Sequence, residues 1–193
     1  MINHKHKFVF IHIPKTGGTS IESIFIDNAN IKDVPGKHSM VSDIDSELLK
    51  NYYTFTFVRN PWDRMVSYYK FRIKRSFNMY NHGDCFRKWI GFLCSDDVQK
   101  IKAYHFNLAI KNQREFLVNK SNKFSVDFIG KFENLQEDFN TVCSDIGIPR
   151  QQLPHVNKTD HKHYTEYYDD ETRQIVAERY AKDIEYFGYK FGV

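Results

Sequence analysis

The feature that most constrains the fold is a glycine-containing turn that separates an apolar run from an amphipathic segment. Residues 8–13 are almost continuously apolar and stop at Pro14, which is typical of a strand buried on both faces. The turn Lys15-Thr16-Gly17-Gly18 follows, and from about Thr19 apolar residues recur at helical spacing. Thr19 and Glu22 also have the spacing of a capping box. The sequence therefore predicts a strand, a tight turn and a helix that begins near Thr19.

A second strand and helix come next along the chain. Residues 53–58 are dense in β-formers, and after Arg59 come Asn60, a predicted N-cap, and Pro61, at the first helical position. Two such units in succession favour parallel strands joined by crossover helices. The predicted fold class is therefore α/β, a single P-loop-like domain with a central parallel sheet flanked by helices over residues 1–193. Further predicted elements are a short helix at 46–50, a strand at 126–130, and helices at 135–146 and 169–187.

Composition limits the class of protein. The 193 residues can bury one core, and 28 Lys and Arg against 24 Asp and Glu give a net charge of only +4. This charge is too small for a polybasic nucleic-acid binder, so any strong anion site must be local. Three cysteines without a CxxC pair indicate neither a disulfide framework nor a cysteine-rich zinc site. No apolar run approaches the roughly twenty residues of a membrane span, so we expect a cytoplasmic protein.

The first turn has the composition of an anion site. Two adjacent glycines, Gly17 and Gly18, let main-chain amides approach a ligand closely, and the start of a helix carries about half a positive charge. Thr19 and Ser20 add hydroxyl donors, and Lys15 adds a full charge. The alternative is an ordinary strand-to-helix turn with a glycine corner. The combination of charge, glycines and hydroxyls favours the anion site.

The second turn indicates how the anion would be bound. The first turn is not a Walker A loop, because Lys15 precedes both glycines. The strand at 53–58 ends in Arg59, where a P-loop NTPase commonly has a magnesium-binding Asp, and an arginine binds phosphate directly in a fork. If the helix begins at Pro61, Ser67 lies about 9 Å from that start along the helix axis, at roughly 1.5 Å per residue. Its hydroxyl could then share one phosphate with Arg59. The alternative is a surface ion pair at Arg59 and a packing role for Ser67.

These residues resemble the sulfotransferases that use 3′-phosphoadenosine 5′-phosphosulfate (PAPS). The stretch FIHIPKTGGTSIESIF is similar to their 5′-phosphosulfate loop, and FVRNPWDRMVSYYKF is similar to their 3′-phosphate motif. FIGKFENLQEDF, LPHVNKTDHKHY and the ending EYFGYKF resemble the carbohydrate-type branch, which includes glycan sulfotransferases and small bacterial members. The resemblance covers most of the chain, in order.

The resemblance implies a role for individual positions. Lys15 would contact the bridging oxygen and the sulfuryl group, and Thr16, Gly17, Gly18, Thr19 and Ser20 would hold the 5′-phosphate through amides and hydroxyls. Arg59 and Ser67 would hold the 3′-phosphate, so the product would be adenosine 3′,5′-bisphosphate. Gln113 and Phe116 would lie beside the adenine, and Asn157 and Lys158 would close over the nucleotide.

Sulfuryl transfer requires a base for the acceptor hydroxyl, and a side chain that titrates near neutrality suits this role. We choose His38, because it lies between the two phosphate turns and the carbohydrate-type branch has a similar histidine; the alternative is an exposed loop histidine. Glu133 is the rival base, and His12 is expected to pack in the buried strand. His155, His161 and His163 do not complete a metal site, and the transfer is expected to need no metal.

The amino-acid sequence leaves three functions open. The first is sulfuryl transfer from PAPS to a hydroxyl of a carbohydrate or glycosylated small molecule, by in-line displacement. The second is an atypical magnesium-dependent nucleotide kinase, and the third is a non-enzymatic binder of nucleotides or anionic glycans. For an acidic acceptor, a basic run on the second helix could guide binding; it comprises Lys70, Arg72, Lys74 and Arg75.

Overall fold

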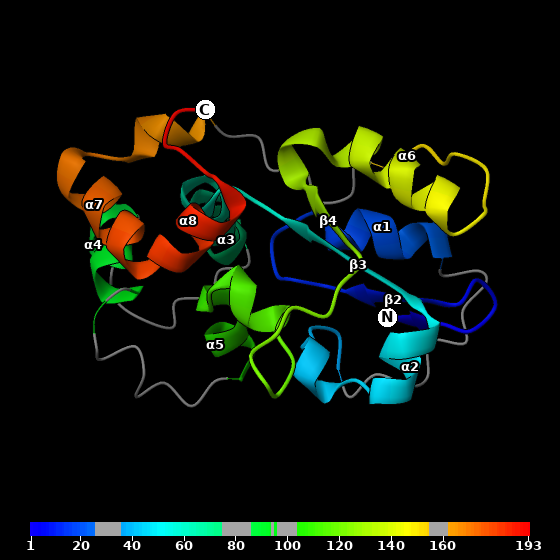
Figure 1. The fold of residues 1–193 in the computed structure, drawn as a ribbon. Helices are drawn as coiled ribbons and strands as arrows, with labels where there is room; N and C mark the ends of the chain where they lie inside the picture. The colour runs from blue at the N-terminus through cyan, green and yellow to red at the C-terminus, as the bar shows by residue number, and fades with distance from the viewer. Residues whose placement is uncertain (26–35, 75–85, 94, 96–103, 155–161) are drawn as a thin grey trace. The chain divides into compact units, whose positions relative to one another are not determined.

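The computed structural model describes residues 1–25, 36–74, 86–93, 95, 104–154 and 162–193 (Figure 1). The chain forms two compact units. The first consists of Met1–Arg59 and Gln113–Asn157, and the second consists of Asn60–Asn112 and Lys158–Val193. Within the described ranges, no helix is long and apolar enough to cross a membrane.

A four-stranded mixed sheet forms the centre of the first unit. Its strands are β1 (Ile2–Asn3), β2 (Phe8–Ile11), β3 (Tyr53–Val58) and β4 (Phe128–Lys131), in the order β1-β2-β3-β4. The β2–β3 and β3–β4 pairs are parallel, as predicted, whereas β1 pairs antiparallel with β2.

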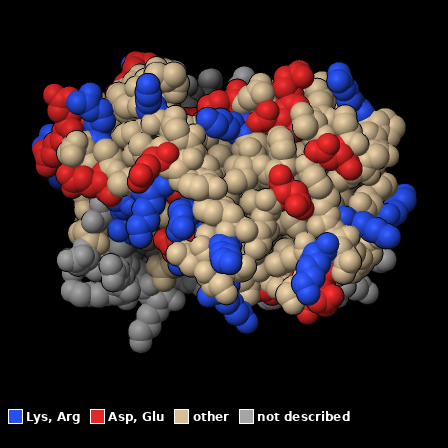
Figure 2. Space-filling model, in the orientation of Figure 1, with Lys and Arg blue, Asp and Glu red and all other residues tan. Residues whose placement is uncertain are grey.

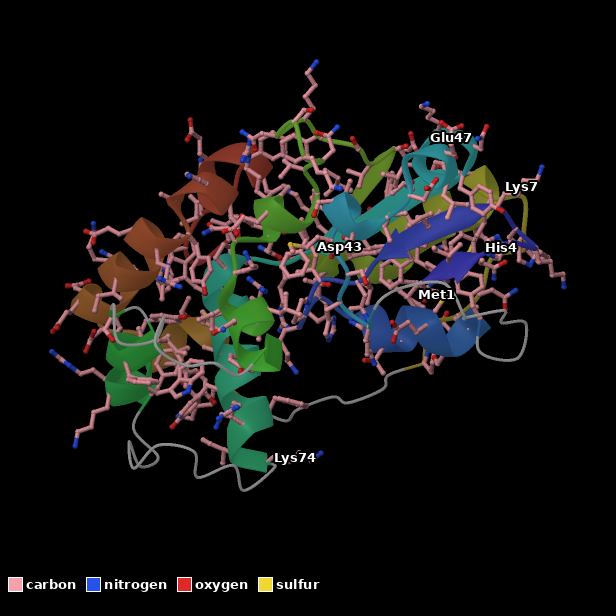
Figure 3. All side chains as sticks on the ribbon, turned by 90° about the horizontal axis from the view of Figure 1, so that it is seen from below. Met1, His4, Lys7, Asp43, Glu47 and Lys74 are labelled. Atoms are coloured by element: carbon pink, nitrogen blue, oxygen red, sulfur yellow. The ribbon has the colours of Figure 1, made fainter. Side chains whose placement is uncertain are left out.

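The prediction of a purely parallel sheet was therefore wrong at one edge. The residues between β1 and β2 turn the chain back on itself, and Lys7 has a left-handed backbone with φ of 50°. Figure 3 labels Met1, His4 and Lys7 in this hairpin. The antiparallel strand was missed because it is only two residues long and has no alternating pattern of its own.

Helices α1 (Gly18–Phe25) and α6 (Leu135–Asp145) cover one face of this sheet (Figure 1). Phe25 of α1 lies against Phe8 of β2, with ring centroids 4.8 Å apart, and against Phe139 of α6 at 6.2 Å. Both helices were predicted from apolar spacing and are confirmed. The first unit also contains α2 (Ser46–Asn51) and the short 3₁₀ helices η2 (Val41–Asp43), η4 (Gln113–Phe116) and η5 (Phe132–Asn134).

Aromatic side chains form rows along the covered face of the sheet. Phe8 and Phe10 lie on the same face of β2. Their rings pack against the ring of Phe55 of β3, with 5.4 Å and 5.0 Å between the centroids. Phe57 of β3 lies over Gly130 of β4, where a Cβ would overlap the Phe57 ring. Because successive residues of a strand alternate between faces, the next positions on these rows are His12, Arg59 and Phe132.

The second unit is helical. It contains α3 (Pro61–Lys74), α4 (Phe86–Leu93), α5 (Tyr104–Ile110), η6 (Tyr164–Tyr167), α7 (Asp170–Arg179) and α8 (Ala181–Phe187). The predicted N-cap of α3 is confirmed, because the Asn60 Oδ1 accepts a hydrogen bond from the Trp62 N–H at 3.1 Å. The apolar residues Trp62, Met65, Val66 and Tyr69 of α3 are buried, whereas Ile73 near its end is 43% exposed.

The predicted last helix is in fact two helices that meet at Tyr180. This residue caps α7 and α8 with φ −108° and ψ 23°, outside the usual helical values. Its ring is buried, and its hydroxyl donates a hydrogen bond to the carbonyl oxygen of Ile110 at 2.9 Å. This long-range bond fixes the residue at the break between the two helices. The apolar spacing of the sequence continues through this position, so the spacing alone could not reveal the break.

Candidate active site

Two of the predicted cationic residues lie together at the carboxyl edge of the sheet. Lys15 follows β2 and Arg59 follows β3, and the Arg59 Nη1 donates a hydrogen bond to the main-chain oxygen of Lys15 at 3.2 Å. Phe132, which follows β4, stacks on the Arg59 guanidinium at 3.8 Å from its ring centroid. The ends of three adjacent parallel strands thus supply neighbouring groups, at the edge where open α/β sheets bind ligands.

The turn that carries Lys15 has an unusual backbone. Lys15 has φ of 71°, a left-handed conformation that is uncommon for a residue with a Cβ, and Gly17 has φ of 84°. Thr16 is fully buried, and its hydroxyl donates to the carbonyl oxygen of Ile13 at 2.9 Å. The Thr16 hydroxyl is therefore part of the structure of the turn. Lys15, Gly17 and Thr19 are partly exposed.

Both glycines of the turn are close to other side chains. At Gly17 a Cβ would lie 2.8 Å from a methyl carbon of Leu135 and 3.2 Å from the Phe132 ring. At Gly18 a Cβ would overlap the His12 ring. The glycines therefore let the turn pack against the sheet edge and α6, in addition to allowing a positive φ at Gly17.

We predict that Gly18→Ala lowers the free energy of unfolding by about 1–3 kcal/mol, because the new methyl group overlaps the buried His12 ring. Gly91→Ala is the matched control, since Gly91 lies inside α4 and a Cβ added there would have no atom within 4 Å. The control should gain about 0.5–1 kcal/mol from the higher helix propensity of alanine. Urea denaturation measures both values, and equal stability of the two variants would contradict the predicted overlap.

The main chain of Arg59 is held by a buried amide. The Arg59 N–H donates to the Gln113 Oε1 at 2.9 Å, and the Gln113 Nε2 donates to the Arg59 carbonyl oxygen at 2.8 Å. Gln113 and Phe116 are both fully buried. Gln113 therefore fixes the residue that follows β3, and the position of Gln113 and Phe116 beside an adenine ring stays a prediction.

His38 lies beside the turn, in contact with the residue that follows β2. Its Nδ1 is 2.8 Å from the carbonyl oxygen of His12, and the two imidazole rings meet edge to face at 4.5 Å between centroids. A carbonyl oxygen only accepts, so Nδ1 carries the proton and Nε2 carries the lone pair in the neutral ring. Burial and the neighbouring His12 lower the pKa of His38 to about 4. His38 is therefore neutral at pH 7, with the basic nitrogen on the other side of the ring.

His12 belongs to an ionic cluster that sequence reasoning missed. Its ring is buried, with 4% exposed, as predicted, and its Nδ1 is 2.7 Å from the Glu22 Oε1. The Lys37 Nζ is 3.1 Å from the Glu22 Oε2. Both carboxylate oxygens of Glu22 are thus engaged away from the helix start, so the predicted capping box with Thr19 does not form. The sequence signal for this cluster was weak: it consisted of His12 at the end of a row that otherwise holds Phe8 and Phe10.

Burial and pairing act in opposite directions on this cluster. Burial lowers the pKa of His12, and the Glu22 carboxylate offsets part of this effect. For Glu22, burial raises the pKa, but the hydrogen bonds and charges of His12 and Lys37 outweigh it, so the net pKa is lowered. The cluster therefore keeps a carboxylate charged close to the Lys15 turn and links α1 to the segment that carries His38.

The other predicted residues within the described ranges lie on η5 or in the second unit. Glu133 lies exposed on η5, and Ser67 is buried on α3 in the second unit, whereas Arg59 belongs to the first. His163 is exposed and lies 2.7 Å from the Thr165 hydroxyl. Lys70 lies over the Tyr167 ring at 5.0 Å. Predictions that fall outside the described residues concern Arg75, His155, Asn157, Lys158 and His161.

Basic side chains are not gathered into one extended patch on the visible part of the first unit. Toward the right of Figure 2, Lys and Arg side chains alternate with Asp and Glu. This mixture agrees with the small net charge of the chain. An anion would therefore be attracted by local groups such as Lys15 and Arg59.

Comparisons with known proteins identify one family. A family model described as the sulfotransferase family matches residues 1–190. Carbohydrate sulfotransferase 9 of Homo sapiens is 26% identical over 95% of this chain and 47% of its own length, and carbohydrate sulfotransferase 11 of Mus musculus is 22% identical over 77% and 53%. This chain thus spans about half the length of these two relatives. An uncharacterized protein of Archaeoglobus fulgidus is 32% identical over 59% of this chain and 83% of its own length.

The match over nearly the whole chain includes the Lys15 turn, Arg59 and the segment around Phe132. The chain therefore belongs to the sulfotransferase family.

Proposed function

We propose that the protein transfers a sulfuryl group from PAPS to a hydroxyl of a carbohydrate or glycosylated small molecule, without a metal ion. The observation that carries this proposal is the contact between Arg59 and the Lys15 turn at the carboxyl edge of the sheet. It brings the Arg59 side chain to the main chain of the Lys15 turn, and we propose that a nucleotide with two phosphate-bearing ends binds at this edge of the sheet. The two compact units would act together as one sulfotransferase domain, in line with the family match over both.

The donor set suits a doubly phosphorylated nucleotide. The turn from Pro14 to Ser20 would act like a P-loop, with main-chain amides of Thr16–Ser20 and the hydroxyls of Thr19 and Ser20 around the 5′-phosphate. Lys15 would contact the bridging oxygen and the sulfuryl group. Arg59 and Ser67 would bind the 3′-phosphate, which distinguishes PAPS from ATP and ADP.

The residues of this chain would contribute positioning and charge stabilisation to an in-line displacement. His38 would accept the acceptor's proton on Nε2 while the acceptor oxygen forms its bond to sulfur. The bond between sulfur and the bridging oxygen breaks, and its electron pair leaves with the 5′-phosphate. Lys15 and the start of α1 would stabilise the charge that develops on that oxygen. The product would be adenosine 3′,5′-bisphosphate.

The carbohydrate class of acceptor rests on the relatives. Two of the similar proteins are named carbohydrate sulfotransferases, and both match most of this chain. We therefore propose a sugar hydroxyl as the acceptor. A screen of glycans with labelled PAPS would identify which one.

We predict that adenosine 3′,5′-bisphosphate at about one hundred times its Kd raises the melting temperature by about 5–10 °C, and that AMP at the same concentration raises it far less. The difference arises because AMP lacks the 3′-phosphate assigned to Arg59 and Ser67. Differential scanning fluorimetry in EDTA measures both shifts and tests the absence of a metal requirement. Equal shifts from the two nucleotides, or a shift that EDTA abolishes, would argue against the proposal.

A further inference from the structure

The main chain and the side chain of Arg59 are both bonded to other segments of the first unit. Its main chain follows β3, and the two hydrogen bonds from the Gln113 side chain reproduce the pairing that a neighbouring strand would supply. Gln113 is fully buried, and these bonds join residues 54 positions apart in the chain. The backbone of Arg59 is therefore fixed by a distant segment.

The side chain of Arg59 is also fixed. Its guanidinium lies 3.8 Å from the centroid of the Phe132 ring, within the range of a cation–π contact, and the residue is only 7% exposed. Phe132 also approaches the turn, since a Cβ at Gly17 would lie 3.2 Å from its ring. One aromatic ring thus stacks on the arginine and lies close to the turn.

The guanidinium reaches the strained position of the turn. Its Nη1 donates to the carbonyl oxygen of Lys15, the residue with φ of 71°. A non-glycine residue in the left-handed region is strained and persists only when its surroundings over-determine it. The bond from Arg59 is one of the contacts that can hold this conformation.

We propose that Arg59, supported by Gln113 and Phe132, is a positioning residue for the Lys15 turn in addition to its role as a phosphate ligand. This inference rests on the proposed function for its nucleotide probes. In this proposal, Arg59 strengthens binding of the 5′ end of the nucleotide through the Lys15 turn, without contact between the guanidinium and the 5′-phosphate. It follows that loss of Arg59 weakens binding of a nucleotide that has no 3′-phosphate.

The test compares two nucleotides across matched variants by calorimetric or NMR titration. Arg59→Ala should weaken AMP binding about tenfold, the effect of losing one charge-assisted hydrogen bond, and should weaken adenosine 3′,5′-bisphosphate binding by a further factor of about ten or more. Arg59→Lys keeps the charge but loses the planar fork and the stacking, so it should restore little of the AMP affinity. Arg150→Ala is the control, because it removes an equal charge from an exposed site of the first unit.

Phe132→Leu provides a second variant that leaves Arg59 in place at a partly exposed site. It should weaken AMP binding several-fold, and so should Gln113→Met if that variant folds. Unchanged AMP affinity in Arg59→Ala, beside a reduced affinity for the bisphosphate, would overturn the positioning role and leave the phosphate role intact.

A measurement without nucleotide separates this inference from the proposed function. Hydrogen–deuterium exchange of the peptide that covers residues 14–20 should be faster in Arg59→Ala and Phe132→Leu than in the wild type and in Arg150→Ala. If the wild type binds neither nucleotide, the proposed function fails, while faster exchange still supports the positioning role. Equal exchange in all four proteins would overturn it.

Discussion

Lys15→Ala should lower kcat for sulfuryl transfer by about 10²–10³-fold, the loss observed when one preorganised donor to a developing negative charge is removed. In the proposed mechanism the ammonium meets the charge that forms on the bridging oxygen as the bond to sulfur breaks. This contact strengthens in the transition state, so kcat should fall much more than the affinity for the donor. Single-turnover transfer from labelled PAPS, in EDTA, measures the effect directly.

Two variants control for charge and for fold. Lys50→Ala removes an exposed lysine that pairs with Glu47 on α2, and should leave kcat unchanged; Figure 3 labels Glu47. Lys15→Arg keeps a positive charge with a different geometry and should recover only part of the rate. Full activity in Lys15→Ala would remove the proposed stabilisation of the leaving group.

His38→Ala should lower kcat/KM for the acceptor by about 10²–10⁴-fold, the range for loss of a general base. The pH dependence is the more specific expectation. A base must be neutral, and burial beside His12 lowers the pKa of His38 to about 4. The wild-type rate should therefore stay constant from pH 8 down to pH 6 and fall only as the pH approaches 4. A histidine with an ordinary pKa of about 6.5 would lose activity already below neutrality.

The matched control is His163→Ala, which removes an exposed histidine of the second unit and should leave the pH profile unchanged. Glu133→Gln tests the rival base. If Glu133 were the base, the large loss of kcat/KM would occur in this variant and not in His38→Ala. A His38→Ala protein with the wild-type rate and profile would exclude His38 as the base.

Much of the fold follows from local patterns. Strand β3 agrees with its prediction at both ends, and helices α1 and α3 begin within a residue of their predicted starts. These elements are defined by signals within a few residues of one another, such as Asn60 before Pro61 or the glycines before α1. The contact between the two turns was also predictable, because parallel strands end at one edge of a sheet.

The sequence could not reveal the contacts that connect distant segments. Gln113 and Arg59 lie 54 positions apart, and the buried amide has no local pattern that distinguishes it from a ligand contact. Glu22 has the spacing of a capping residue, yet its carboxylate pairs with His12 and Lys37. In each case the tertiary partner decides the role of the side chain, and propensity or spacing predicts only the local alternative.

The hydrogen bond between His38 and the His12 carbonyl has a consequence for how such an enzyme can diversify. His12 lies three positions before Lys15 and extends the aromatic row of β2, so this bond ties the proposed base to the chain segment that leads into the proposed donor-binding lysine. In the proposed enzyme, segments that contact the acceptor could then vary while His38 stays bonded to the end of β2. Such a layout would let the acceptor preference of the proposed enzyme evolve separately from the chemical step.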